Sequence, residues 1–263
     1  MKLLGTIVAA LLLFVSSAHD GLAHFGMVIP SEVTVMENER ANIELNLKFW
    51  HPFENRGMDL AKPAAFDVYF DGESQSLLSS LKEGKEQGKT VWSTPYKITR
   101  PGLYAFVMQP QPYWEPEEDC FIVHYTKAYV DAFGDVEGWS EPLGLKAEIV
   151  PLSRPSALYA GNVFQGQVLF NGKPVSGAEV EIEWYPGVEM TGQAPNATMV
   201  TQTVRADNQG IFTYAAPNSG WWGFAALLEG DYKLKQGDED QDVEVGAVLW
   251  IYFHKMQDAK VLK

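Results

Sequence analysis

Apolar and polar residues alternate along most of the chain with a period of two, the pattern of β-strands that bury one face. The clearest run places five residues on a single face: Ile43, Leu45, Leu47, Phe49 and His51. That face is expected to be the buried one. His51 therefore ends a row of core residues, directly before Pro52, which stops the strand.

A second regular alternation covers residues 178–184, in which three glutamates share one face. We expect Glu179, Glu181 and Glu183 to line a solvated face. The preceding Asn171-Gly172 pair is a strong signal for a two-residue hairpin turn, because both central positions of such a turn need positive φ.

Further short strands are predicted between turn residues, and no stretch predicts a helix of ordinary length. Residues 74–90 are polar and are expected to form an exposed loop or a weak helical turn. Residues 109–119 contain three prolines and should be irregular. The rhythm predicts an all-β protein of two antiparallel β-sandwich units, an N-terminal domain over residues 24–150 and a C-terminal domain over residues 156–256.

The first 23 residues have the grammar of a secretory signal peptide: Met1-Lys2, a short apolar segment, then small residues. Cleavage after Ala18 or after Ala23 fits, and we favour Ala23 because residues 25–30 already form a strand pattern. The apolar segment is too short to span a bilayer, which disfavours an uncleaved anchor, and no later stretch is long enough for a transmembrane anchor after processing.

The chain carries 34 acidic and 20 basic residues and a formal net charge of −14. This charge disfavours nucleic acid as a partner and suits a soluble protein that attracts cations. Cys120 is the only cysteine, so no internal disulfide forms.

Four histidines remain after cleavage at Ala23, and each neighbours an aromatic residue in the sequence: His24, His51, His124 and His254. An N-terminal histidine offers a metal both its imidazole and its free α-amine. We therefore predict that the fold gathers these histidines around a divalent transition metal. Imidazole and amine nitrogens suit Ni²⁺, Co²⁺, Cu²⁺ and Zn²⁺ alike.

Other donors could complete such a site. Glu54 lies three residues after His51, and the methionines Met27, Met58, Met108 and Met256 are soft donors that more often fill cores. Cys120 is expected to be a buried, inert thiol. The acidic runs at 115–119 and 238–242 are expected to be solvated loops.

The sequence lacks the Gly-x-Ser-x-Gly, His-Glu-x-x-His and phosphate-loop motifs, so we expect a binding protein and not an enzyme. Two alternatives stay open: a structural or adhesion-type sandwich without metal, and a carbohydrate-binding protein or copper-dependent oxygenase. The pair Trp221-Trp222 would serve the latter as a sugar platform, although its apolar surroundings favour a place in the core.

Five segments, in this order, resemble the DUF4198 family of periplasmic proteins: residues 23–30 (AHFGMVIP), 49–54 (FWHPFE), 113–116 (YWEP), 220–223 (GWWG) and 249–253 (LWIYF). The resemblance implies a periplasmic, β-rich protein associated with nickel or cobalt uptake, with a membrane metal-uptake transporter as its partner. Residues 171–182, with the later turn at 207–212, resemble a transthyretin-like or CNA-B-like sandwich.

Overall fold

The computed structural model describes residues 24–36, 41–134, 137–187 and 190–256, and the expected signal peptide over residues 1–23 lies outside them. The described residues form twenty-one strands and two short 3₁₀ helices, η1 (Leu78–Ser80) and η2 (Ala197–Met199). The predicted all-β class with packed antiparallel sheets is confirmed. No helix among the described residues has the length and apolar character needed to cross a membrane.

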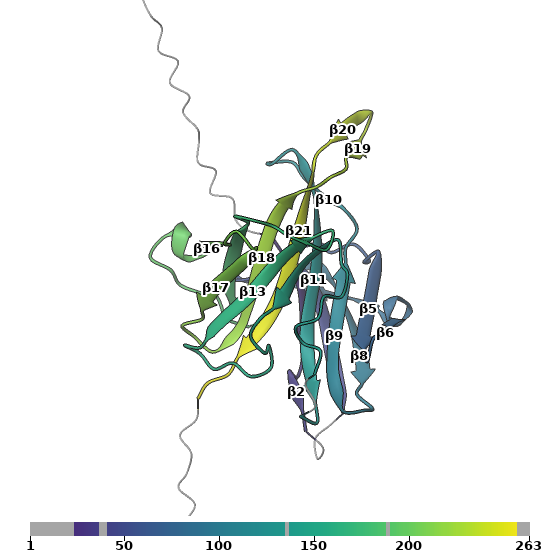
Figure 1. Cartoon of the computed structure of the whole chain (residues 1–263). Coiled ribbons are helices and arrows are strands. Elements are labelled where there is room, and N and C mark those ends of the chain that lie inside the picture. The colour runs from purple at the N-terminus through teal and green to yellow at the C-terminus, as the bar shows by residue number, and fades with distance from the viewer. Residues whose placement is uncertain (1–23, 37–40, 135–136, 188–189, 257–263) are drawn as a thin grey trace, which may run out of the picture.

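A ten-stranded sheet forms the middle of the molecule (Figure 1), in the order β16-β15-β18-β21-β11-β9-β5-β6, with β10 and β2 also paired to β11. Its strands are β2 (Thr34–Val35), β5 (Ala65–Phe70), β6 (Glu73–Ser76), β9 (Gly102–Gln109), β10 (Tyr113–Glu115), β11 (Cys120–Ala132), β15 (Glu179–Tyr185), β16 (Gln202–Arg205), β18 (Gly220–Glu229) and β21 (Val243–Phe253).

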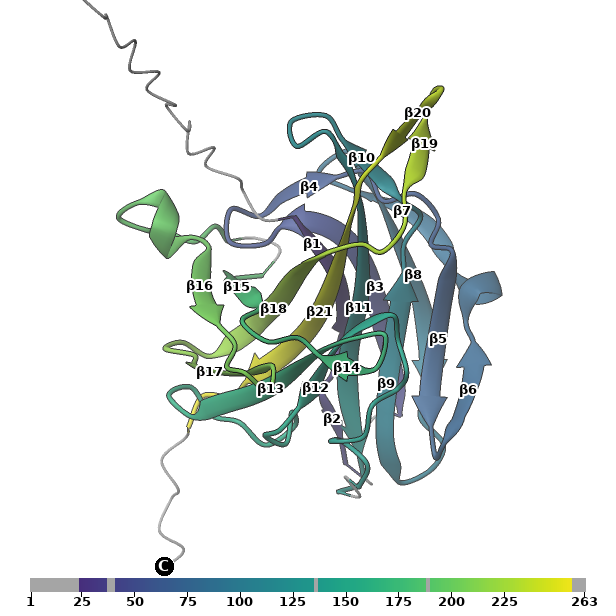
Figure 2. The same cartoon turned by 45° about the horizontal axis from the view of Figure 1, so that its top comes forward.

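Two smaller sheets pack against the central one. The N-terminal sheet contains β1 (Phe25–Pro30), β3 (Asn42–His51), β4 (Arg56–Met58), β7 (Lys82–Glu86) and β8 (Lys89–Lys97). The C-terminal sheet contains β12 (Ala147–Pro151), β13 (Val163–Phe170), β14 (Lys173–Pro174) and β17 (Ile211–Ala215). A separate hairpin, β19 (Leu234–Gln236) and β20 (Glu239–Gln241), projects from one end (Figure 2).

The two halves of the sequence meet inside the central sheet. β11 and β21 pair in parallel, from Phe121 opposite Val243 to Ala128 opposite Trp250. The sheet is therefore continuous across the two units that the sequence predicts, and β12, which ends the first of them, pairs with β13 of the second. Their boundary at residues 150–156 stays a prediction.

Both faces of the central sheet are buried, which explains the unbroken apolar run of β21. Val248 and Trp250 point into the core shared with the N-terminal sheet. Leu249 and Ile251 point into the core shared with the C-terminal sheet. A strand covered on both sides loses the alternation that marks a half-exposed strand.

Two segments depart from the sequence prediction. The polar stretch at residues 74–90 holds a short helical turn, η1, as one of the two expected forms, but it also includes most of β6 and all of β7. These two strands carry few apolar residues because they lie at sheet edges. The proline-rich stretch at residues 109–119 contains β10, a three-residue strand between Pro112 and Pro116. The predicted hairpin turn is present, with φ of 50° at Asn171 and 72° at Gly172.

The prediction of a solvated glutamate face is wrong for most of β15. Glu179 is exposed, but Glu181 is half-buried and Glu183 is only 1% exposed. Tyr185, on the same face, belongs to the core under the N-terminal sheet. The alternation was recognised correctly, but sequence alone could not show that a second layer covers this face.

A buried ion pair links the central sheet to the C-terminal sheet. Lys127 of β11 is 1% exposed, and its Nζ lies 2.5 Å from Glu148 Oε1 of β12. The Glu148 carboxylate also accepts hydrogen bonds from the backbone N–H groups of Leu143 and Gly144. Removing one charge of such a pair leaves the other buried and uncompensated.

We therefore expect Lys127→Ala to lower the free energy of unfolding by about 3–5 kcal/mol. The matched control is Lys235→Ala, since Lys235 pairs with Asp240 on the surface and such exposed pairs contribute about 0–1 kcal/mol. Urea unfolding of the two variants measures the difference. Equal losses of unfolding free energy in the two variants would show that the buried pair stabilises the fold no more than the exposed pair does.

Candidate functional site

His24 and His51 lie side by side at one end of the N-terminal sheet. The β1–β3 register pairs Phe25 with Trp50, which places His24 across from His51, the last residue of β3. Their ring centroids are 4.5 Å apart, with an angle of 51° between the rings. His51 is 5% exposed, so the predicted core-facing end of β3 is confirmed.

Glu115 supplies a carboxylate to this pair. His24 Nε2 lies 3.2 Å from Glu115 Oε2, and the Glu115 side chain is 7% exposed. Burial lowers the pKa of His24, and the charge of Glu115 opposes that shift in part. The ring is therefore held largely neutral near pH 7, the form in which imidazole can bind a metal.

His124 also contacts the Phe49 ring. Phe49 stacks on His24 at 5.5 Å and meets the His124 ring edge-on at 6.1 Å. His124 is 1% exposed; its Nε2 lies 3.2 Å from Glu244 Oε1, while its buried Nδ1 has no hydrogen-bond partner. A small cavity of about 60 Å³ borders Phe49 and His124.

Gly246 makes room for the His124 ring. A Cβ at Gly246 would lie 2.3 Å from His124 Cδ2, closer than side chains can approach. The parallel register of β11 and β21 sets these two residues opposite each other. The C-terminal strand therefore shapes the surroundings of a histidine more than a hundred residues away.

His254 does not join the others. β21 runs away from the β19–β20 end of the molecule (Figure 1), so His254 lies ten residues beyond Glu244, about 33 Å at the usual rise of a strand. Its N–H donates to the Leu158 carbonyl and its ring contacts Tyr252 at 5.0 Å. The sequence identified a strand end correctly but could not give the direction of the strand.

The other donors that the sequence suggests for the metal site lie in different surroundings. Glu54 lies 3.6 Å from Arg56, an exposed pair, and Glu115 is the carboxylate found at His24. Met27 and Met108 are fully buried in the core, where methionine usually serves as filler. Burial, with the nearby charges of Glu244 and Glu118, raises the pKa of Cys120 to about 11, so this thiol stays protonated.

Sequence reasoning missed Glu115 and Glu244. Glu115 belongs to an acidic run that the sequence predicts to be solvated, and its place beside Tyr113 and Trp114 is the one local signal against that prediction. Nothing local marks Glu244, because its contact with His124 depends on the β11–β21 pairing. Among the described residues, no group of three or more His, Cys, Asp or Glu side chains is arranged so that it could hold a metal ion.

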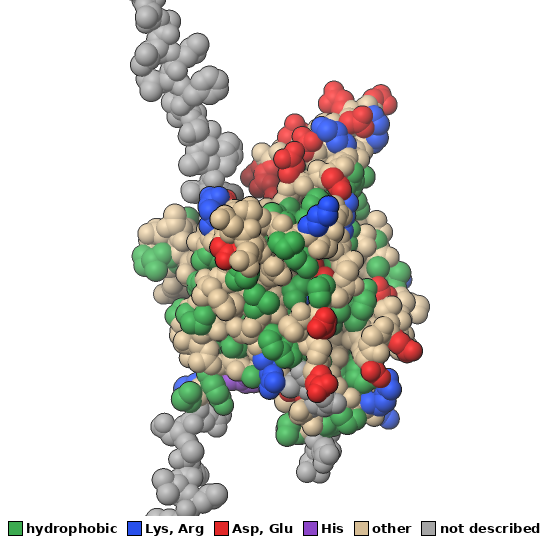
Figure 3. All heavy atoms as spheres, viewed as in Figure 1, with side chains coloured by type: hydrophobic (Ala, Val, Ile, Leu, Met, Phe, Trp, Pro, Cys, Tyr) green, Lys and Arg blue, Asp and Glu red, His purple; other side chains and the backbone are tan. Residues whose placement is uncertain are grey.

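Acidic side chains surround this end of the molecule. Figure 3 shows them gathered on and beside the β19–β20 hairpin, which directly precedes β21 and Glu244 in the chain. Glu117, Asp238, Glu239 and Asp240 are all exposed there. Lys233 and Lys235 pair with Asp242 and Asp240 on this hairpin. With a net charge of −14, the acidic excess is expected to give this end a negative potential that attracts cations.

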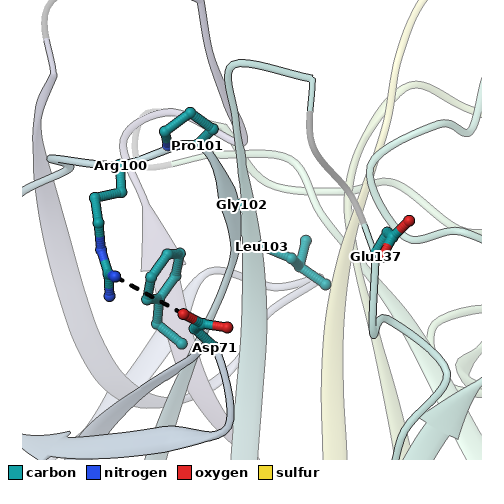
Figure 4. Close-up of a pocket in the computed structure, with 7 residues that line it drawn as sticks. Asp71, Arg100, Pro101, Gly102, Leu103 and Glu137 are labelled. Carbon is teal, nitrogen blue, oxygen red and sulfur yellow. Dashed lines mark ion pairs between the residues drawn. The ribbon is translucent and has the colours of Figure 1, made fainter.

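The larger cavity in Figure 4 lies elsewhere, between the β5–β6 turn and the start of β9, and has a volume of about 420 Å³. Arg100 lies over the Phe70 ring at 4.4 Å and pairs with Asp71 at 3.7 Å, while Glu137 faces them from the opposite wall. No histidine is among the described residues that line this cavity.

The two neighbouring tryptophans lie on opposite faces of β18. Trp222 is 2% exposed and donates its Nε1–H to the Asn218 carbonyl. Trp221 points to the opposite face, where it meets Tyr252 edge-on at 5.5 Å. The expected place of this pair in the sandwich core is confirmed for Trp222.

Comparison with known proteins identifies the family. The family described as "Domain of unknown function (DUF4198)" matches residues 21–230, most of the chain. The chain belongs to the DUF4198 family. The matched residues include His24, His51 and His124, whereas His254 lies beyond them. No curated protein matches the chain.

Solved structures show only distant similarity. The D0-D1 domain of intimin shares 14% identity with 86% of this chain and 97% of its own, at a TM-score of 0.24. The Yersinia pseudotuberculosis adhesin InvE shares 12% identity over 84% and 58%, at 0.23. Titin domains A168-A170 share 9% over 83% and 65%, at 0.22. At these scores the similarities support no functional argument.

The two buried glutamates of β15 predict a pH dependence of stability. Burial raises the pKa of Glu181 and of Glu183 to about 7, from an ordinary value of 4.5. Because the folded state holds these protons up to higher pH, ionisation favours unfolding. The resulting cost is absent below about pH 4.5 and fully present above about pH 7.

We therefore expect the double variant Glu181→Gln, Glu183→Gln to gain stability relative to the wild type as pH rises from about 5 to about 8. Urea unfolding at several pH values measures the gain. Glu179→Gln is the control, since Glu179 is exposed, and its effect should not change with pH in this way. A gain in unfolding free energy that stays constant with pH would contradict the raised pKa values of Glu181 and Glu183.

Proposed function

We propose that the mature protein binds a divalent transition metal at His24 and His51, in the periplasm, in support of metal uptake. The observation that carries the proposal is the 4.5 Å separation of these two imidazole rings beside the expected cleavage site. Cleavage after Ala23 would add the α-amine of His24 as a third nitrogen. Binding would be reversible, with no reaction carried out on the metal.

The types of donor at this place suit such an ion. His24 and His51 offer imidazole nitrogens, Glu115 offers an oxygen at His24, and His124 has a buried Nδ1 without a partner. Nitrogen-rich sites suit Ni²⁺, Co²⁺, Cu²⁺ and Zn²⁺. Phe49 and Tyr113, which contact the His24 ring, would limit access of water and keep the ring oriented.

Nickel or cobalt is the proposed cargo, on the strength of the family resemblance, and a membrane metal-uptake transporter is the proposed recipient. Ligand type alone favours Cu²⁺ among these ions, so copper belongs in every binding test. The negative potential at this end of the molecule would raise the local concentration of any of these cations.

The first test is the start of the mature chain. We expect intact-mass analysis of the exported protein to give a chain that begins at His24, because cleavage there frees an amine at the histidine pair. A chain that begins at His19 would place the amine five residues away and remove it from the proposed site.

The second test is metal titration of four proteins by calorimetry with Ni²⁺, Co²⁺ and Cu²⁺. The native-start chain should bind one equivalent. The His51→Ala variant lacks one imidazole, and a chain with extra residues before His24 lacks the free α-amine of that histidine. Each should bind metal at least about tenfold more weakly, a loss of about 1.4 kcal/mol, because each lacks one nitrogen donor. His254→Ala should bind like the native-start chain.

The His254 variant is the matched control, since it removes an imidazole that lies at the far end of β21, ten residues beyond Glu244. If all four proteins bind equally, neither the amine nor His51 is a ligand. If the native-start chain binds none of the three metals, the proposed function is wrong.

A further inference from the structure

The His51 end of β3 is set by a tight hairpin. Residues 52–55 reverse the chain into β4, so that His51 lies opposite Arg56. The Asn55 N–H donates to the Pro52 carbonyl, and Asn55 takes a positive φ of 51°. Any displacement of this turn moves His51, because only one residue separates Phe53 from it.

Residues from the second half of the chain form hydrogen bonds with Phe53, which lies within this turn. The Phe53 N–H donates to Glu183 Oε2 at 3.2 Å, and the Gly192 N–H donates to the Phe53 carbonyl at 2.7 Å. Both backbone groups of this residue are thus bound by partners at least 130 residues away. Trp184 meets the Phe53 ring edge-on at 6.4 Å.

Gly192 also lies directly against the Phe53 ring. A Cβ at Gly192 would lie 2.3 Å from Phe53 Cε1, so only glycine permits this approach. The turn is therefore held by its backbone N–H, its carbonyl and its side chain. These three contacts together fix the position of Phe53 relative to the second half of the chain.

Glu183 connects the turn to the interior of the molecule. Its side chain is 1% exposed, and its second oxygen accepts a hydrogen bond from the Thr201 hydroxyl. Burying a carboxylate is costly unless its oxygens are bonded. Both bonds to Glu183 come from segments outside its own strand, so the carboxylate joins three segments of the chain.

We propose that Glu183 is a positioning residue for His51, through its hydrogen bond to Phe53. The second half of the chain then sets the distance between His51 and His24, although it supplies neither ligand. This inference rests on the proposed metal-binding function, but the hold on the turn can be measured without metal.

The test uses three variants of the native-start chain. Glu183→Ala removes the acceptor for Phe53. Glu183→Gln keeps an acceptor oxygen and is the conservative rescue. Thr201→Val removes the other hydrogen bond to Glu183 but leaves the bond to Phe53, so it reports a general loss of stability. Each is titrated with Ni²⁺ and Cu²⁺, and its metal-free form is followed by hydrogen exchange at the 52–55 turn.

We expect Glu183→Ala to weaken binding at least about tenfold and to speed exchange at the Phe53 amide, since its acceptor is gone. Glu183→Gln should stay within about threefold of the wild type in both measurements. Thr201→Val should lower the melting temperature but leave affinity and Phe53 exchange near wild type. Losses of affinity that simply follow the loss of stability across the variants would overturn the proposal.

Gly192→Ala tests the same idea if Glu183→Ala does not fold. Its added methyl would collide with the Phe53 ring and must displace it, so this variant should weaken binding while Glu183 stays in place. Unchanged affinity in Gly192→Ala would count against the proposal. If the wild type binds no metal, the proposed function fails, and Phe53 exchange alone then decides whether Glu183 holds the turn.

Discussion

The parallel pairing of β11 with β21 is the constraint on which the rest of the structure depends. It joins a strand from the first half of the chain to the last strand, over eight residue pairs. Antiparallel pairs extend the sheet from there in both directions, through β9 and β5 on one side and β18 and β15 on the other. Without that pairing the sequence would have two separate sheets and two separate cores.

The same pairing gives the central sheet its two buried faces and allows charged groups to be placed between layers. Lys127 and Glu148 join the central and C-terminal sheets. On the other face, Lys48 of β3 is 3% exposed, lies over the Trp50 ring and reaches Glu86 and the Tyr185 hydroxyl. Such pairs are costly to bury but allow few alternative alignments of the layers.

The histidines illustrate how layers make a site. His24 and His51 meet because β1 and β3 are neighbours in the N-terminal sheet, whereas His124 belongs to the central sheet and reaches them across Phe49. Glu115 and Glu244 arrive from β10 and from β21, on either side of β11. The candidate site thus lies between two layers. Its residues come from β3, β10, β11 and β21, together with His24, which directly precedes β1.

The sequence by itself determined the strand content, the face of β3 that ends in His51, the turn at Asn171-Gly172 and the family. These follow from local rules: a period of two, positive φ in a tight turn, and short motifs in a fixed order. It also suggested which residue types a metal would need, but it grouped His254 with the other three histidines and left Glu183 in solvent.

Only the tertiary structure decided those points, and the physical reason is the same for each. Strand direction and layer stacking depend on contacts between residues more than a hundred positions apart, and no local pattern records them. His254 points away because β21 runs parallel to β11, and Glu183 is buried because the Phe53 turn covers the end of β15. Periodicity reveals that a strand has two faces; what lies against each face is settled by the rest of the chain.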